Sequence, residues 1–397
     1  MRRSSVRELA EAVRPRYRRA SKAGRGRILD VFCAATGYHR AYARALLRGT
    51  ASGPPGQGRA GRPPRYGSRE QDLLRACWEL SDRICGKRLA PFLPELLERL
   101  VACDCLPTEA TPEVVARVGQ MSAATVDRLL GPDRAGWPKR GLGTTKPGTL
   151  LKGQVPIKTF AEWDEAVPGF LELDLVAHCG ASGAGEFAFT LSAVDVATGW
   201  MSVQAVRNKG ELAVFAALEQ LRAELPFVLR GLDSDNGGEF INRNMLRYCQ
   251  DEAITLTRSR PYRKNDNCHI EQKNWSVVRR LVGYARFEGA ALGPLQRLYA
   301  LAQDYVNFLQ PVRKLREKTR DGAKLTKRYD GAQTPYRRLL ATGTLAADVA
   351  AELAAHSATL HPIRLKLDLE AAQQALYRQA VRAEPRLPVR RAFEKVL

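Results

Sequence analysis

Leu-Asp-Ser-Asp-Asn-Gly-Gly-Glu-Phe, residues 232–240, is the most informative stretch of this chain. Apolar residues followed by aspartates and an Asn-Gly pair are typical of a strand that ends in an acidic turn. A second acidic site lies inside the apolar run 170–176, where Glu172 and Asp174 share one face of an expected strand. Carboxylates in buried strands are costly unless a partner such as a divalent cation compensates for them. The sequence therefore indicates a metal site built on strands.

A third carboxylate completes this pattern, because 35 residues separate Asp235 from Glu271 in a segment predicted to be helical. Two strand-borne aspartates and a helix-borne glutamate can hold two Mg²⁺ ions about 3.5–4 Å apart, a geometry that suits in-line phosphoryl displacement. Strand periodicity makes Glu172 and Asp174 equivalent, and likewise Asp233 and Asp235. The residues alone do not choose within either pair.

The segment from about Phe160 to Arg286 resembles the catalytic core of the retroviral-integrase superfamily, the DDE transposases. The resemblance rests on the 35-residue spacing, the stretch at 232–240 and the Arg-Pro-Tyr run at 260–262. The flanking regions resemble those of bacterial insertion-sequence transposases. The resemblance implies a catalytic and metal-binding triad that holds two Mg²⁺ ions, with Mn²⁺ as a substitute, and the residues in these roles are Asp174, Asp235 and Glu271.

Polar residues around the triad are candidates for near-site roles, and these are His178, Asn236 and Asn267. A structural histidine is the preferred interpretation of His178, and Asn236 is equally suited to capping the next helix. Asn267 lies one turn before Glu271, and Asn274 and Trp275 lie one turn after it, so all are expected to share its helix face. Asp195 is interpreted as a hairpin-end residue.

Basic residues on the adjoining faces of that helix suit backbone phosphates, and they are Lys273, Arg279 and Arg280. A solvated basic face is the alternative. The net charge of the chain is +21, and residues 1–67 carry 16 Lys and Arg against three acids. A second excess, of ten basic over three acidic residues, runs from Arg313 to Arg338. This clustering indicates a polyanion partner, since neutralised phosphates release counterions.

Composition also excludes some classes of protein. The chain has no run of 18 apolar residues and no apolar segment after its basic start, so neither a membrane span nor a signal peptide is expected. Eight scattered cysteines without a Cys-X-X-Cys pair indicate free thiols in a reducing cytosol. Retroviral integrases carry an amino-terminal His-His-Cys-Cys zinc domain, but the first 160 residues here hold only His39. Cys103-Asp104-Cys105 has the wrong spacing for a zinc knuckle.

Two helix-turn-helix-like DNA-binding regions are expected ahead of the core, at 1–51 and 68–131. In the first, Ile28, Val31, Phe32 and Ala35 form the apolar face, and Gly37 breaks the helix. In the second, Ser68 caps the first helix, and Gly119 and Ser122 delimit the turn before a recognition helix. Between them, 52–67 is a Gly/Pro/Arg linker in which Gly61-Arg62-Pro63 resembles a minor-groove hook, although a plain spacer is the simpler interpretation. The candidate DNA contacts in these regions are Arg40, Arg44, Arg62, Thr125 and Arg128.

The fold class predicted is multidomain: α-helical helix-turn-helix domains, then an α/β ribonuclease-H-like catalytic core at 161–287, reached through a basic connector at 132–160. A basic, mostly helical C-terminal region follows at 288–397. In the core we expect strands near 170–177, 186–196, 200–206, 227–233 and 253–257, and helices near 210–224, 239–251 and 267–285.

The predicted function is metal-dependent DNA strand cleavage and strand transfer at the ends of a mobile element. The partners expected are double-stranded DNA, as terminal repeats and target, and further copies of the chain assembled on that DNA, with no membrane partner. A bacterial cytoplasmic protein associated with the nucleoid is expected. The alternatives are a domesticated, non-catalytic DNA-binding regulator and a metal-dependent nuclease of the same fold that acts on RNA–DNA hybrids.

Overall fold

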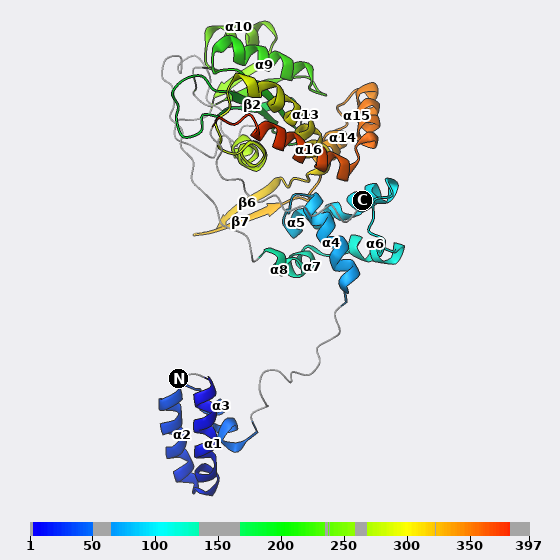
Figure 1. The fold of residues 1–397 in the computed structure, drawn as a ribbon. Coiled ribbons are helices and arrows are strands. Elements are labelled where there is room, and N and C mark those ends of the chain that lie inside the picture. Colours follow the sequence, from blue (N-terminus) through cyan, green and yellow to red (C-terminus); the bar gives the residue numbers. More distant parts are fainter. Residues whose placement is uncertain are drawn as a thin grey trace. The chain divides into compact units, whose positions relative to one another are not determined.

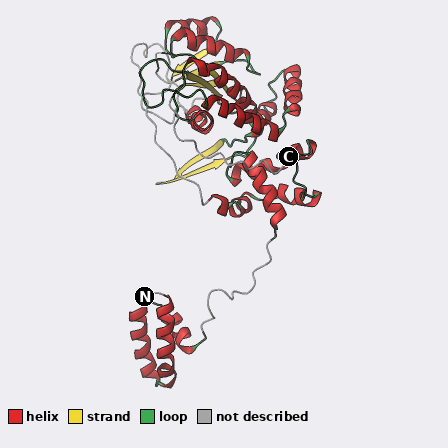
Figure 2. Cartoon of the chain, in the orientation of Figure 1, coloured by secondary structure: helices red, strands yellow, loops and turns green. Residues whose placement is uncertain are grey.

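The computed structural model describes residues 3–50, 65–134, 167–234, 237, 239–258, 268–321 and 323–381. The chain forms two compact units, residues 1–65 and 66–397. Figure 1 shows the course of the chain, and Figure 2 shows that helices predominate around a single large sheet and a separate hairpin. Within the described residues, no helix is long and apolar enough to cross a membrane.

The first unit is a three-helix body of α1 (Arg3–Arg19), α2 (Lys22–Thr36) and α3 (Arg40–Arg48). Helix α2 ends at Gly37, whose φ of 71° is the left-handed conformation that favours glycine, and the expected break is confirmed. The expected apolar face of α2 is partly wrong, because Val31 is 71% exposed and Leu29 packs inside with Phe32. Leu29 and Phe32 belong to a core that α2 shares with both α1 and α3.

The second unit begins with a helical subunit of α4 (Ser68–Leu80), α5 (Gly86–Ala102), α6 (Pro112–Gly119), α7 (Ala123–Leu129) and α8 (Gly131–Arg134). Gly67 is the N-cap of α4 and Ser68 its first residue, so the expected Ser68 cap is wrong by one position. Ser122 does cap α7, accepting a hydrogen bond from Thr125 N at 3.3 Å.

The core is a five-stranded sheet in the order β3-β2-β1-β4-β5. Its strands are β1 (Phe170–Ala177), β2 (Phe189–Asp195), β3 (Met201–Val206), β4 (Gly231–Ser234) and β5 (Thr255–Arg258). Strands β1, β2 and β3 are antiparallel, whereas β4 and β5 run parallel to β1. This mixed sheet is the predicted integrase-type core, with every strand where one was expected.

Helices cover both faces of this sheet (Figure 1). Helices α9 (Glu211–Ala223) and α10 (Arg243–Asp251) pack on one face, over Leu171 and Leu173. On the other face pack α11 (Cys268–Lys273), a π-helix (Asn274–Arg279), α12 (Arg280–Val282) and α13 (Leu292–Leu309). A short 3-10 turn (Gly289–Ala291) lies between α12 and α13. One apolar core therefore continues from this face of the sheet into the helical subunit and the C-terminal helices.

The described part of the C-terminal region is mostly helical, as expected, but it also contains a hairpin that was not predicted. An antiparallel hairpin of β6 (Leu315–Asp321) and β7 (Lys324–Tyr329) precedes α14 (Pro335–Ala341), α15 (Ala347–Thr359) and α16 (Pro362–Tyr377). The hairpin strands carry almost no apolar side chains, so hydrophobic periodicity gives no strand signal there. Residues 322 and 323 connect the strands and read Gly-Ala in the sequence, and glycine at the first position of a two-residue connection was the available clue.

Candidate active site

Asp174 lies on β1, the central strand of the sheet, and is half-buried. Its Oδ2 accepts a hydrogen bond from Asn274 Nδ2 at 2.5 Å, and its Oδ1 accepts one from Leu175 N at 2.8 Å. Ser192 is the partner of Asp174 in the β1–β2 register, and its hydroxyl donates to Asn274 Oδ1 at 2.6 Å. Asn274 thus joins the Asp174 carboxylate to the neighbouring strand.

Glu271 lies in the first turn of α11 and is exposed. It precedes Asn274 by three residues, so the Asn274–Asp174 hydrogen bond holds the turn that carries Glu271 against β1. The preceding amide also holds this helix, because Ile270 N donates to Glu172 Oε2 at 2.9 Å. The Glu271 side chain is therefore presented from a helix anchored to β1 at two points.

The first acid of each pair in the sequence is buried. Glu172 is 0% exposed and Asp233 is 1% exposed, and the two are partners in the parallel β1–β4 register. Asp233 Oδ1 accepts from Thr257 Oγ1 on β5 at 2.5 Å. Of the acids in β1, Asp174 is therefore the one with access to solvent, while Glu172 and Asp233 serve interior hydrogen bonds.

Asp235, Asn236 and Asn267 lie outside the described residues. The described chain reaches Ser234, the last residue of β4, which is opposite Leu173 in the register. Asp235 is the next residue in the sequence after Ser234, just as Asp174 is the next after Leu173.

The helix with Glu271 is not regular. Its turn from Asn274 to Arg279 is a π-helix, which adds a residue to each turn and frequently occurs at functional sites. Asn274 is 8% exposed, whereas Trp275 is 52% exposed. Glu271 is exposed as well, so these exposures do not separate Trp275 from its face, and the expectation that both residues share that face stays a prediction.

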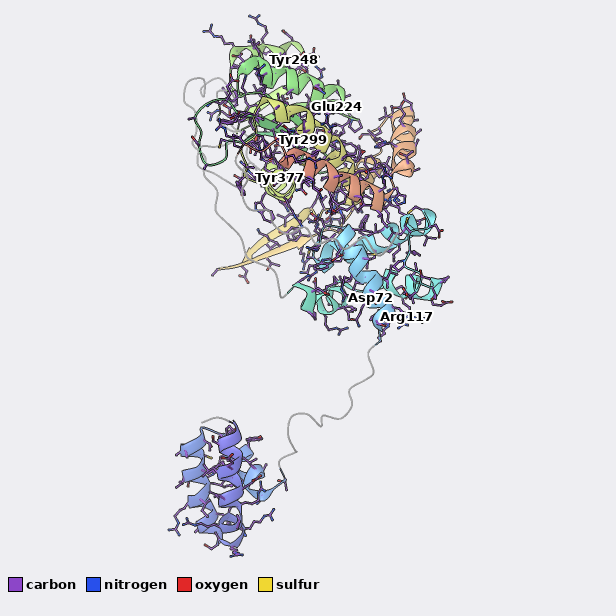
Figure 3. The ribbon with its side chains drawn as sticks, viewed as in Figure 1. Asp72, Arg117, Glu224, Tyr248, Tyr299 and Tyr377 are labelled. Carbon is purple, nitrogen blue, oxygen red and sulfur yellow. The ribbon has the colours of Figure 1, made fainter. Side chains whose placement is uncertain are left out.

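His178 is 1% exposed and makes interior contacts only. Its Nε2 lies 2.6 Å from Thr190 Oγ1 and 3.5 Å from the hydroxyl of Tyr299 on α13, and its ring packs edge-on against Phe287. Figure 3 labels Tyr299, which lies on α13. Burial, with a smaller contribution from the Arg279 guanidinium, lowers the pKa of His178 to about 3. These contacts are those of a neutral core histidine.

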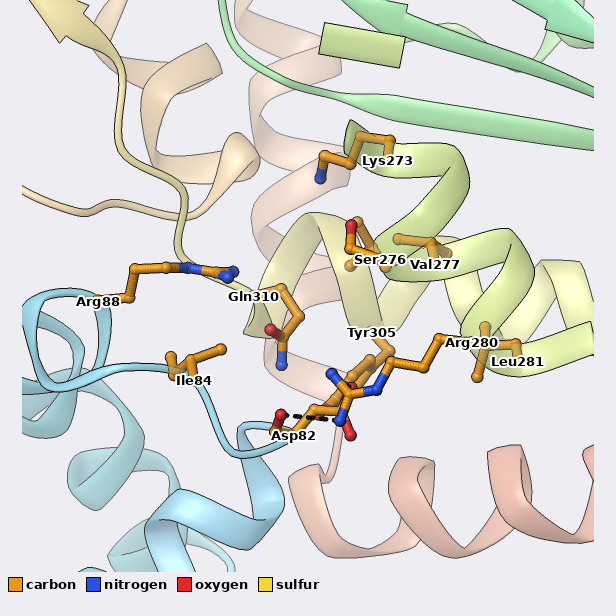
Figure 4. Close-up of a pocket in the computed structure, with 11 residues that line it drawn as sticks. Asp82, Ile84, Arg88, Lys273, Ser276, Val277, Arg280, Leu281, Tyr305 and Gln310 are labelled. Carbon is orange, nitrogen blue, oxygen red and sulfur yellow. Dashed lines mark hydrogen bonds and ion pairs between the residues drawn. The ribbon is translucent and has the colours of Figure 1, made fainter. Parts of the chain in front are cut away.

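The basic residues after Glu271 face other parts of the protein. Arg279 Nη1 donates to Ala177 O at 3.1 Å, at the end of β1. Arg280 forms an ion pair with Asp82 of the helical subunit at 2.7 Å. Lys273 lines a cavity of about 60 Å³ with Arg88, Arg280 and other residues (Figure 4). Burial and, to a smaller extent, the Arg88 guanidinium together lower the pKa of Lys273 to about 7.

The candidate DNA contacts in the helical regions are more accessible. Arg44 and Arg128 are exposed, and Thr125 is half-buried beside the exposed Ala124 at the start of α7. Arg40 forms an ion pair with Asp30 across the α2–α3 turn. Arg62 lies outside the described residues. The exposed start of α7 thus has the small side chains that close approach to a groove requires.

Asp195 has a clear structural role at the end of β2. Its carboxylate accepts hydrogen bonds from Gly169 N at 2.8 Å and from Thr198 N and Oγ1 at 2.7 and 2.6 Å. Burial raises the pKa of Asp195, and these hydrogen bonds oppose the rise. The interpretation as a hairpin-end residue is confirmed.

Comparison with known proteins gives consistent matches. A family model described as the integrase core domain matches residues 164–264. The uncharacterized protein y4rM of Sinorhizobium fredii (strain NBRC 101917 / NGR234) is 43% identical over 335 residues, covering 83% of this chain and 94% of that protein. The BIV integrase catalytic core is 20% identical with a TM-score of 0.31, over 44% of this chain and 95% of that one. The HTLV-2 integrase catalytic core with magnesium is 16% identical with a TM-score of 0.29, over 37% and 91%. The chain belongs to one family with the y4rM protein, and its residues 164–264 match the integrase core domain.

Proposed function

We propose that this protein is a transposase that cleaves DNA at the ends of a mobile element and joins those ends to target DNA. One observation carries the proposal. Asp174, half-buried on the central strand, is hydrogen-bonded through Asn274 to the helix that presents Glu271. Asp235 follows β4 directly, and we propose it as the third carboxylate beside Asp174.

The donor set fits Mg²⁺, which prefers carboxylate oxygens, and we propose two ions per site with Mn²⁺ as a substitute. Asp174 is half-buried and Glu271 is exposed, so an ion can reach both carboxylates from solvent. Bound ions would stabilise charge on the attacking and departing oxygens of the phosphodiester. We propose Asp174, Asp235 and Glu271 as the residues that hold them.

The remaining side chains position this set. Asn274 fixes the orientation of the Asp174 carboxylate, and its own orientation is fixed by Ser192. Glu172 holds the start of α11 through Ile270 N, which limits rotation of the turn with Glu271. His178 is neutral and buried, and we propose that it supports the fold instead of moving a proton.

We propose that DNA is held mainly by the helical regions. The candidate contacts are Arg40, Arg44, Arg62, Thr125 and Arg128. The contacts of Lys273, Arg279 and Arg280 are intramolecular, and we propose that these three position the helix with Glu271 rather than bind phosphates. Joining two ends requires at least two copies of the protein, assembled on the DNA in the cytoplasm.

The test is divalent-metal-dependent nicking of DNA that carries the terminal repeats found beside the gene. The full chain is expected to nick this DNA with Mg²⁺, and Asp174→Asn and Asp235→Asn are each expected to lose at least about 10³-fold in rate while binding the repeats normally. Asp251→Asn, the same change at an exposed acid of α10, is the matched control and should nick normally. Repeat binding without nicking by the unmodified chain would favour a regulator, and nicking confined to RNA–DNA hybrids would favour a nuclease.

A further inference from the structure

Two cysteines and a histidine from distant parts of the chain meet outside the carboxylate site. Cys103 follows the last residue of α5, Cys105 lies two residues later, and His361 is the N-cap of α16. Their ligand atoms all lie within 4.8 Å of one another, and Cys105 Sγ is 3.2 Å from His361 Nε2. The three side chains are half-buried, so a small ion can reach them from solvent.

We propose that Cys103, Cys105 and His361 bind one Zn²⁺ ion, with a solvent molecule as the fourth ligand. Thiolate and imidazole are the ligands that zinc prefers, and three protein ligands with one open position is a common zinc arrangement. With Zn–S near 2.3 Å and Zn–N near 2.0–2.1 Å, a tetrahedral site needs an S···N separation of about 3.5–3.6 Å. The present 3.2 Å must widen by about 0.3–0.4 Å, which small side-chain rotations supply.

Metal binding changes the hydrogen bonds of the site. His361 Nδ1 accepts from Arg364 N at 3.2 Å, which places the proton of a neutral imidazole on Nε2. Coordination through Nε2 requires the other tautomer, so this capping hydrogen bond is exchanged for a metal–nitrogen bond. Burial, with a contribution from Cys105, raises the pKa of the Cys103 thiol to about 11. Thiolate is the form of cysteine that binds metal, so metal binding releases the thiol proton.

The proposed site lies where the helical subunit meets the C-terminal helices. Arg99, one turn earlier on α5, donates to Ser357 O at 3.2 Å and to Ser357 Oγ at 2.9 Å, near the end of α15. Zinc would add a second connection between the same parts of the chain. The proposal does not rest on the proposed transposase activity, because its ligands are thiolates and imidazole, whereas the catalytic carboxylates suit Mg²⁺.

The experiment is a Co²⁺ titration of the full, metal-free chain in the presence of a phosphine reductant. We expect one equivalent of Co²⁺ to give the charge-transfer absorption of a cobalt–thiolate bond and the d–d bands of tetrahedral cobalt, and Zn²⁺ to displace it. Cys103→Ser and His361→Asn should each abolish these bands. Asparagine is a good N-cap, so His361→Asn removes the ligand but keeps α16 capped. Cys85→Ser, an exposed cysteine at the other end of α5, is the matched control and should keep the bands.

A second measurement is the thermal unfolding midpoint with and without Zn²⁺. We expect Zn²⁺ to raise the midpoint of the unmodified protein and of Cys85→Ser, but not those of Cys103→Ser and His361→Asn. The proposal is overturned if the folded, reduced protein takes up no metal, or if the bands persist in both ligand variants. A Cys103–Cys105 disulfide that survives the reductant would also overturn it.

Discussion

Asn274→Ala should weaken metal binding at the proposed active site without removing any metal ligand. The substitution deletes the donor to Asp174 Oδ2 and the acceptor for the Ser192 hydroxyl. A hydrogen bond to a charged group contributes about 1.5–3 kcal/mol, and about 1.4 kcal/mol corresponds to a factor of ten. We therefore expect the Mg²⁺ concentration for half-maximal nicking to rise roughly 10–100-fold, the range typical for partners of metal ligands.

The same substitution should also lower stability. Ser192 is 0% exposed, but it retains a 3.3 Å hydrogen bond to Asp174 O, which limits the cost of losing Asn274. We expect a loss of about 2 kcal/mol and a drop of several degrees in the thermal midpoint of the metal-free protein. Gln272→Ala, at an exposed position of the same helix, is the matched control and should change neither quantity measurably.

The assays are nicking rates over a Mg²⁺ series and thermal unfolding of the metal-free protein, with repeat binding measured to confirm an intact fold. The reasoning is refuted if Asn274→Ala matches Gln272→Ala in both Mg²⁺ dependence and thermal midpoint. A lower midpoint with unchanged Mg²⁺ dependence would show that Asn274 is structural only.

Three further predictions concern DNA binding and pH. Deleting residues 1–65, a separate compact unit that carries most of the positive charge, should flatten the plot of log K against log salt for repeat DNA by about 0.9 for each phosphate that these residues neutralise; an unchanged slope would place the binding elsewhere. Ala124→Glu, at the exposed start of α7, should weaken specific binding far more than non-specific binding, whereas Ala347→Glu at the exposed start of α15 should not; footprinting on repeat DNA distinguishes them. The folded-state pKa of His178, about 3, lies below its ordinary value of 6.5, so the unfolded chain binds the extra proton between these values and stability falls as pH drops through that window. The slope is up to about 1.4 kcal/mol per pH unit, and thermal midpoints of His178→Gln from pH 7 to 4.5 should show it reduced.

The order of the core elements could be predicted because its signals are local. The apolar run at 170–176 and the acidic turn after residue 232 each carry their own strand signal, and all five expected strands are present. Boundaries were less accurate: β4 begins at Gly231, not near 227, and α10 begins at Arg243, not near 239. In both cases a segment of irregular backbone precedes the element. Apolar residues of these segments, such as Leu229 and Phe240, pack in the same core as the element that follows.

Contacts between distant segments were beyond the reach of sequence patterns. Asn274 meets Asp174 across 100 residues, and Cys105 meets His361 across 256. The spacing rule that excluded a zinc knuckle at Cys103-Asp104-Cys105 counts only nearby ligands, and it is silent about a histidine delivered by another helix. The π-helix at 274–279 was also missed, because the regular α-helical period was assumed where each turn of the helix holds about one more residue.

The two acidic pairs show what the fold adds to an alternating sequence. Glu172 and Asp174 share a face of β1, but only Glu172 lies deep enough to be fully covered by α11 and to bind its backbone. Asp233 stands beside Glu172 in the register and is equally covered, with Thr257 as its donor. Each strand thus uses its first acid to hold neighbouring backbone or side chains inside the core. On β1, the acid two residues later emerges toward solvent with its carboxylate already oriented by Asn274. Because two residues advance a strand by about 6.6 Å, the buried acid supports the helix that presents Glu271 and lies apart from the cation that we propose at Asp174.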